Sequence, residues 1–475
     1  MTSPSQALAP KTSLKQNRRR SYYYPQARVS LSVVFETFGD IQAPRTFPVT
    51  PRAITIHNNS YKEADSFSLE FDARDLPVSP DLIKGGAAEI YLFQAQGIGQ
   101  LPDYVKAKDS EDSPQLEGLE PSIVGIFDNV SMEFSSSGRM VTIDGTDYTS
   151  LFISKQWQTR PKKKAKGTSK VVSSKRVSTG KDLGATISSL MREVESADAL
   201  QLVVIIPKGT SLPIVGSGES RAYRKGIPFK DAENYWDVMY ALAARYGFIL
   251  FVRNLNVILT TPKAYLEDRS DVRKMTWGKN LTSLRMSRKI GKEQVPTIEV
   301  RSYDSKARKI RKARYPKDRK QKPTTGLGTV KDEIRVMTVP GVQKESQLLQ
   351  VAETAYNLLA RAEQSIEIET MDLTDEEGRD LIELRTGDPL SIGFAPRTRD
   401  LLEAQSFSQR VQTLVGLGFL PQVAVVISST FDKINQFKHP FRVKEATLEW
   451  GYESGLRIAA SLQTVVNPAS SGDKP

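Results

Sequence analysis

Two short stretches, Ala53-Ile-Thr-Ile-His57 and Ser66-Phe-Ser-Leu-Glu-Phe71, decide the fold class of this chain. Apolar and polar residues alternate in both, which is the pattern of a β-strand with one buried face. The polar residues 58–64 between them predict the turn of a β-hairpin. A period of two therefore indicates a sheet in this part of the chain.

Further strand patterns follow the hairpin. Residues Glu89–Phe93, Val124–Phe134 and Arg139–Ile143 each read as a strand, and the last two flank Ser135-Ser-Ser-Gly138. This turn predicts a second hairpin in which Gly138 takes a positive φ angle. Regularly spaced short strands favour a barrel or a sandwich, so we expect a first β domain over residues 28–154.

The period of the apolar residues changes after residue 181. A helix is predicted from Leu183 to Val194 with Asp182 as its N-cap. A second helix runs from Tyr235 to Tyr246, with Asp231 as the expected cap and Gly247 as its end. Residues 248–260 then predict a tight hairpin. We expect a small α+β domain over residues 182–278.

Strand patterns return from residue 279, and one helix is predicted over residues 345–363. Residues 279–467 therefore form a second expected β domain, and residues 468–475 a loose C-terminal tail. The 475 residues are enough for about three domains. The predicted class is mainly β with an α+β insertion. The expected strands of the second β domain are Leu281–Met286, Thr297–Tyr303, Ile334–Val339, Ile366–Thr370, Pro389–Phe394, Ser406–Leu414, Val423–Ser428, Arg442–Trp450 and Leu456–Val465.

The formal net charge of +12 is unevenly distributed. Residues 1–30 contain six basic residues and no acidic residue, and residues 155–181 contain ten basic residues and no acidic residue. Residues 301–322 contain eleven basic and two acidic residues. Such segments bury little apolar surface, so we expect a flexible tail (1–27), a flexible linker (155–181) and a flexible loop (301–322) unless a partner orders them. They are interpreted as solvated linkers, as contacts for acidic protein surfaces, or as nucleic-acid contacts.

Eight basic residues are the candidate electrostatic partner contacts. The basic segments lack interleaved aromatic residues for base stacking, and no helix-turn-helix, zinc-finger or RNP motif accompanies them. A nucleic-acid-binding protein is therefore the alternative function rather than the first one. The candidate contacts are Lys162, Lys163, Lys164, Lys166, Arg308, Lys309, Arg311 and Lys312.

Catalytic, cofactor and metal sites are not expected. The chain has no Cys and two His, which removes thiolate chemistry and most general bases. Asp144 and Asp147 near a strand end are interpreted as structural, because nothing in the sequence raises the pKa of either carboxyl group. The acidic run after Asp372 does not fit a calcium loop, and Thr374-Asp-Glu-Glu377 reads as a capping box that opens a helical turn. No apolar run is long enough to span a bilayer, so no membrane partner is expected.

The order of these signatures resembles a known family. Residues Pro51–Ile56, Ile83-Lys-Gly-Gly86 and Val141–Leu151 follow one another as in a tail-hub barrel, and Ile298–Asp304, Arg385-Thr-Gly-Asp-Pro389 and Phe441–Val443 repeat such signatures. The chain resembles the baseplate hub proteins of contractile-tailed bacteriophages, the late control protein D-like family. That family is similar to the N-terminal part of type VI secretion spike proteins. The resemblance covers most of residues 28–467.

The resemblance implies a non-enzymatic structural protein of the virion tail baseplate, assembled in the host cytoplasm. It implies a homotrimer in which two tube-like β-barrels per chain form a ring with an axial channel for DNA. Such a ring adapts the hexameric tail tube to a central spike. The implied partners are the tail tube protein, the central spike protein, the baseplate wedge proteins and, transiently, phage DNA in the channel. The sequence shows no fused lysozyme-like segment and no repetitive C-terminal spike.

Overall fold

The first β unit contains the predicted hairpin. In the computed structural model, Ile56 of β4 lies opposite Phe67 of β5, and both side chains are buried. The second predicted hairpin is also present, and Gly138 has a φ of 138° as expected. The elements of this unit are β1 (Tyr23–Thr37), β2 (Asp40–Ile41), β3 (Arg45–Val49), β4 (Ala53–Asn58), β5 (Ser66–Asp72), η1 (Pro80–Leu82), β6 (Ile83–Gln96), β7 (Ile123–Ser135), β8 (Gly138–Asp147) and α1 (Thr149–Ser154).

The structure describes most but not all of the chain. Every structural statement below concerns the described residues, and Lys162, Lys163, Lys164 and Lys166 lie outside them. The described ranges are 23–37, 40–59, 62–96, 120–135, 138–157, 175–195, 197–206, 211–216, 226–229, 232–261, 264, 272–277, 279–288, 297–304, 308–316, 334–339, 345–360, 364–375, 377–394, 406–416, 420–422, 424–425, 441–452 and 454–463.

The α+β unit follows the first β unit along the chain. Asp182 caps α2 as predicted, since its side chain accepts a hydrogen bond from Ala185 N. The cap of α3 is Asn234 and not the predicted Asp231, whereas Gly247 ends that helix with a φ of 79°. The elements are β9 (Arg176–Val177), α2 (Leu183–Met191), β10 (Gln201–Ile205), β11 (Ile227–Pro228), α3 (Tyr235–Arg245), β12 (Ile249–Arg253) and β13 (Asn256–Thr260).

The last part of the chain forms the second β unit and a separate small sheet. The small sheet has the order β17-β16-β18 and is covered by α5. The second β unit consists of β14 (Arg273–Trp277), β15 (Ser283–Arg288), β19 (Gln364–Thr370), β20 (Pro389–Phe394), α7 (Phe407–Gly416), β21 (Phe441–Gly451) and β22 (Gly455–Gln463). The small sheet and its helix are β16 (Thr297–Asp304), β17 (Lys309–Tyr315), β18 (Ile334–Thr338) and α5 (Glu345–Ala360).

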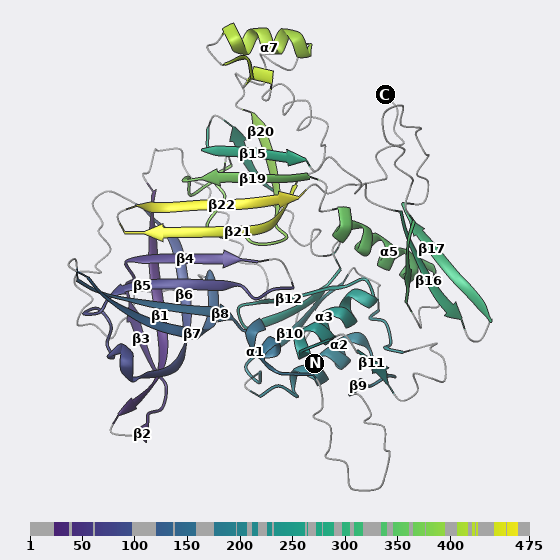
Figure 1. The fold of residues 1–475 in the computed structure, drawn as a ribbon, viewed down its shortest axis with the longest axis horizontal. Helices are drawn as coiled ribbons and strands as arrows, with labels where there is room; N and C mark the ends of the chain where they lie inside the picture. Colours follow the sequence, from purple (N-terminus) through teal and green to yellow (C-terminus); the bar gives the residue numbers. More distant parts are fainter. Residues whose placement is uncertain are drawn as a thin grey trace.

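The predicted mainly β class is confirmed, and the two β units are joined edge to edge. Strand β4 of the first unit pairs antiparallel with β21 of the second, so that Ile56 lies opposite Leu448. This pairing gives one 14-stranded sheet within the described residues, and the two units share one hydrophobic core. Figure 1 shows the two β units one above the other, with the α+β unit beside them.

A second core unites the α+β unit with the small sheet. Ile298 and Val300 of β16 and Leu348 of α5 are buried in the same cluster as Trp236 of α3. Helix α5 confirms the helix predicted over residues 345–363 as far as Ala360. The described residues therefore pack around two main hydrophobic cores, and a small third cluster lies on β12 and β13.

Some segments predicted as flexible are ordered. Residues 23–27, expected in the tail, begin strand β1. Lys175 of the expected linker forms an ion pair with Glu193 (2.6 Å) and lies over the ring of Trp157. The loop expected over residues 301–322 contains the end of β16 and all of β17, because this basic segment pairs with a strand whose other face is buried.

One predicted strand is a helix. Residues 406–414 were expected to be extended, but α7 begins at Phe407. Phe407, Val411 and Leu414 recur with helical spacing, and Leu414 is buried. Ser406 N donates to Gln409 Oε1 (2.9 Å), which is half of a capping box. Ala424 and Val425, in the next expected strand, are also helical.

Candidate functional site

One turn of the second β unit, residues 384–388, makes hydrogen bonds to the first β unit. Thr386 Oγ1 donates a hydrogen bond to the carbonyl oxygen of Asn59 (2.8 Å), and Arg385 Nη2 donates to that of Pro121 (2.9 Å). Asn58 Nδ2 donates to the carbonyl oxygen of Leu384 (3.4 Å). The turn belongs to the Arg-Thr-Gly-Asp-Pro signature noted in the sequence, so these residues hold the units in register.

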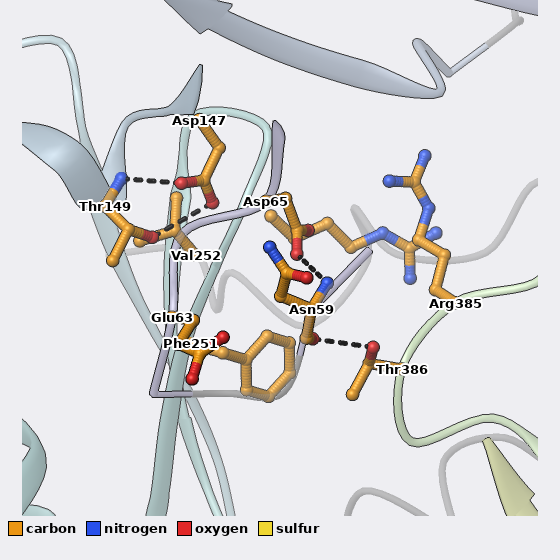
Figure 2. Close-up of a pocket in the computed structure, with 10 residues that line it drawn as sticks. Asn59, Glu63, Asp65, Asp147, Thr149, Phe251, Val252, Arg385 and Thr386 are labelled. Atoms are coloured by element: carbon orange, nitrogen blue, oxygen red, sulfur yellow. Dashed lines mark hydrogen bonds between the residues drawn. The ribbon is translucent and has the colours of Figure 1, made fainter. Parts of the chain in front are cut away.

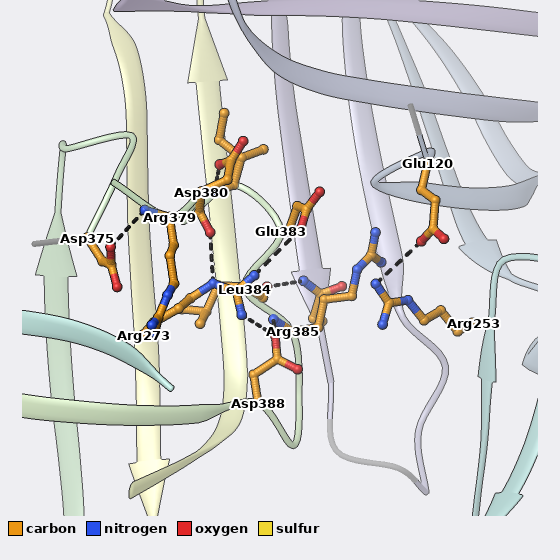
Figure 3. Close-up of polar contacts among 12 residues, drawn as sticks. Glu120, Arg253, Arg273, Asp375, Arg379, Asp380, Glu383, Leu384, Arg385 and Asp388 are labelled. Atoms are coloured by element: carbon orange, nitrogen blue, oxygen red, sulfur yellow. Dashed lines mark hydrogen bonds and ion pairs between the residues drawn. The ribbon is translucent and has the colours of Figure 1, made fainter. Parts of the chain in front are cut away.

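The same turn carries a buried ion pair (Figure 3). Arg273 of β14 donates from Nη1 to Asp388 Oδ2 (3.1 Å) and from Nε to the carbonyl oxygen of Asp380 (2.7 Å). Asp388 is 0% exposed and also accepts a hydrogen bond from Arg385 N. Burial lowers the pKa of the Arg273 guanidinium. Because the pair is enclosed, each charge depends on the other for compensation.

The acidic run after Asp372 forms a turn of a different kind from the one predicted. Thr374 and Asp380 form an antiparallel bridge, so Thr374 does not begin a helical turn. The Asp375 carboxylate accepts hydrogen bonds from Arg379 N (2.8 Å) and from Lys274 N (2.8 Å). It therefore closes the turn and ties it to β14.

A partly open cavity of about 30 Å³ lies where the first β unit, the α+β unit and the joining turn meet. Figure 2 shows Asp147, Thr149 and Val252 at one end of the view, Asp65 and Phe251 in the middle, and Arg385 and Thr386 at the other end. The other lining residues are Asn59, Glu63, Thr149 and Arg253.

Two carboxyl groups at this cavity have unusual pKa values. Burial raises the pKa of Asp65 to about 6, although the amide of Asn59 and the charge of Arg385 act in the opposite direction. Burial and then the charge of Asp65 raise the pKa of Asp147 well above its usual value. The prediction that nothing raises the pKa of Asp144 or Asp147 is therefore wrong for Asp147. Its neighbour Asp65 is 82 positions away in the sequence, and no local pattern connects them.

Four of the predicted contact residues lie together. Lys309, Arg311 and Lys312 are exposed on β17, and Arg308 precedes them with a φ of 49° in the turn. They form one basic strand at the edge of the small sheet, next to an open groove lined partly by Lys312 and by residues at the start of α5. The structure thus brings this half of the predicted set together.

The outer face of the small sheet was not predicted. The Glu299 carboxylate is 1% exposed and binds both Arg301 Nε (2.6 Å) and Arg314 Nε. Tyr303 and Ile310 lie opposite each other on the same face and are 52% and 65% exposed. A sheet face that combines fixed guanidinium groups with exposed apolar side chains is typical of an interaction surface.

No catalytic or metal-binding arrangement is found among the described residues. There, no three His, Cys, Asp or Glu side chains are placed so that they could hold a metal ion. His57 Nδ1 lies 3.0 Å from Thr447 Oγ1 across the β4–β21 junction, where it has a structural contact. His439 lies outside the described residues. In the described ranges no helix has the length and hydropathy required to cross a bilayer.

Comparison with known proteins finds similarity in fold and none in sequence. No protein-family model and no curated protein matches the chain. A tail protein from Neisseria meningitidis superposes with a TM-score of 0.52 and 11% identity, over 92% of this chain and 96% of that one. A 43 kDa prophage tail protein from Shewanella oneidensis has a TM-score of 0.49 and 11% identity, over 93% and 99%. An E. coli component of the type VI secretion system has a TM-score of 0.44 and 7% identity, over 88% and 75%. Along nearly its whole length, this chain therefore shares the fold of the Neisseria meningitidis tail protein.

Proposed function

We propose that the chain is the structural hub of a contractile phage tail baseplate. The observation that supports this function best is the shared fold with the Neisseria meningitidis tail protein, which extends over 92% of the chain. A likeness confined to one domain would indicate only that the two proteins share a widespread domain type. This likeness instead includes both β units and the α+β unit between them. The expected place of the protein is the virion tail, after assembly in the host cytoplasm.

In the proposed assembly, three copies form a ring. The first β unit, within residues 28–154, and the second β unit, formed by β14 and by the strands of 279–467 outside the small sheet, each act as a tube-like barrel, so that a trimer presents six similar barrels to a hexameric tail tube. The edge-to-edge pairing of β4 with β21 supports this arrangement, because it already places two such units side by side in one chain. A closed ring also covers strand edges that would otherwise promote aggregation. The axial channel is the expected path of the DNA.

The proposed partners are the tail tube protein, the central spike protein and the baseplate wedge proteins, without turnover chemistry in this chain. We assign Arg308, Lys309, Arg311 and Lys312 on β17 to electrostatic contacts with acidic surfaces of these partners, together with Lys162, Lys163, Lys164 and Lys166. Exposed charges of this kind steer association and set its specificity more than its affinity.

Light scattering coupled to size-exclusion chromatography tests the proposed trimer directly. The expected mass is three times the chain mass of 52.9 kDa, and negative-stain images should show a ring with a central opening. A monomer that persists at high protein concentration and physiological salt would contradict the proposal.

A nucleic-acid-binding protein is the second candidate, favoured by the basic strand β17. Electrostatic DNA binding weakens steeply with salt, and each lost phosphate contact lowers the slope by about one. The triple variant K309A/R311A/K312A would then flatten the slope by about three, whereas the exposed Arg192→Ala control would leave it unchanged. If the triple variant keeps its DNA affinity but no longer assembles into tails, the hub is favoured.

A further inference from the structure

Strand β17 lies at one edge of the small sheet. It pairs with β16 on one side, and on its other side no strand is paired with it within the described ranges. In an antiparallel pair only alternate residues of an edge strand exchange hydrogen bonds with the neighbouring strand, so the backbone groups of the others point outward. This edge is therefore available to an extended segment that lies beside it.

An open groove of about 660 Å³ lies between this edge and the start of α5. One wall is the strand itself, and the other is the first turn of the helix, where Leu349 packs against the core of the small sheet. Backbone groups along one wall and an apolar side chain on the other are the two features by which a sheet edge binds a peptide. The lining residues are Lys312, Ala313, Arg314, Glu345, Ser346 and Leu349.

The charge along the groove is mainly positive. The register of β17 with β16 places Lys312 opposite Arg301 and Arg314 opposite Glu299, all on one face of the sheet. Both guanidinium groups donate from Nε to the same carboxylate, that of Glu299. Two guanidinium groups and Lys312 thus lie beside one acidic group, so this face has an excess of positive charge.

This charge selects the occupant of the edge. A second copy of β17 is disfavoured, because pairing two such strands places like charges close together. Nucleic acid fits poorly, since phosphates offer no donors to the carbonyl groups of a strand edge and none of the described lining residues is aromatic. An acidic peptide segment matches both the backbone groups and the charge.

We propose that the groove beside β17 binds an acidic, extended segment of a partner protein, which joins the small sheet as an additional strand. The inference rests on the proposed function in one respect, namely that this partner is another protein of the tail.

The groove also predicts the sequence pattern of the bound segment. Successive residues of a strand point to opposite faces of the sheet. Two acidic residues separated by one position would therefore lie beside Lys312 and Arg314, and the apolar residue between them would point towards Ala313 and Leu349. Near Glu345, the acidic side chain among the described lining residues, the segment should carry a polar or basic residue.

Fluorescence anisotropy of a labelled peptide mixed with the full chain tests the groove. The probe is a synthetic peptide of about eight residues, an ordinary strand length, with Glu-Val-Glu at its centre and Thr on both sides. It should bind saturably, and the same peptide with Lys in place of Glu should bind at least about tenfold more weakly. Methylation of alternate backbone nitrogens removes main-chain donors but no charge, and it should also weaken binding at least about tenfold.

Variants of the groove test where the peptide binds. Lys312→Glu reverses an exposed charge and should weaken binding at least about fivefold, and Ser346→Trp should do the same by filling the groove. Glu345→Lys should tighten binding about threefold, a gain that loss of structure cannot produce. The matched control is Arg192→Glu, an exposed position outside the groove, which should bind the peptide like the wild type.

Any of three results would overturn the proposal. These are no saturable binding at about 1 mM peptide, undiminished binding of the methylated peptide, and a single-stranded oligonucleotide that binds more tightly than the acidic peptide and responds to the same variants. The assay separates this inference from the proposed hub. A trimeric ring that does not bind the peptide would refute the groove alone, whereas a monomer that binds it would refute the hub alone.

Discussion

Replacement of Asp388 by Asn tests whether the ion pair under the joining turn holds the two β units together. Asp388 is fully buried, and the Arg273 side chain that it binds is 13% exposed. The variant keeps the shape of the side chain but leaves the guanidinium charge without its closest partner. Breaking a buried pair costs about 3–5 kcal/mol. Since the exposed Glu383 lies 3.7 Å from Arg273 Nη2 and compensates in part, we expect a loss of about 3 kcal/mol in the free energy of unfolding.

Urea unfolding followed by tryptophan fluorescence measures this loss, because Trp277 and Trp450 pack in the core shared by the two β units. Arg457→Ala is the matched control. Arg457 pairs with two carboxylates at 2.6 and 3.0 Å, but its side chain is 46% exposed, so the cost should stay below about 1 kcal/mol. A loss in Asp388→Asn no larger than in this control would refute the reasoning.

Removal of both charges separates the two contributions. The double variant R273M/D388L removes both charges but also the hydrogen bonds of this pair to Arg385 N and to the Asp380 carbonyl oxygen, so it should recover part of the loss seen in Asp388→Asn and not all of it. If the double variant is as unstable as Asp388→Asn, the loss comes from disrupted packing of the turn and not from an uncompensated charge.

Three further changes have defined expected outcomes. A Cβ added at Gly145 would overlap a backbone carbonyl of the adjacent strand, so Gly145→Ala should lower the free energy of unfolding by about 1–3 kcal/mol, measured by thermal unfolding. In the control Gly85→Ala the added Cβ meets nothing within 4 Å, so the loss should be less than about 0.5 kcal/mol. Equal losses in the two variants would contradict this prediction. Asp182→Ala removes the cap of α2 and should cost about 1 kcal/mol, measured by urea denaturation, whereas no change would show that the cap is dispensable. Trp236→Phe removes the donor to the Lys62 carbonyl oxygen (3.0 Å) and should cost about 1–3 kcal/mol by calorimetry, with an unchanged melting temperature as the contrary result.

Local periodicity was sufficient for much of the fold. The hairpin of β4 and β5, the helix α3 and the helix α5 follow from alternating or helical spacing within a few residues of each position. Local periodicity also contains the information for α7, because the spacing of the apolar residues from Phe407 to Leu414 is helical. The strand predicted there is therefore wrong for a local reason. These features required no knowledge of distant contacts.

Charge alone was a poor guide to order. The basic segment that contains β17 was expected to be a loop, yet Ala313 is buried between β16 and α5 while Lys309, Arg311 and Lys312 stay exposed. The long side chains remain in water, and one small buried residue with a paired backbone is enough to hold the strand. Its order depends on a helix that begins more than 30 residues later.

The sequence by itself determined where strands and helices form, because backbone conformation responds to neighbours along the chain. Only the tertiary structure decided that β4 joins β21, that Asp65 meets Asp147, and that Arg273 lies against Asp388. These contacts connect residues that lie from 82 to 398 positions apart, the largest separation being that of Ala53 and Gly451. These contacts stabilise the protein only after folding has brought the residues together. Burial then makes an unpaired charge or an open strand edge costly, and this cost favours the structure in which each of them has a partner.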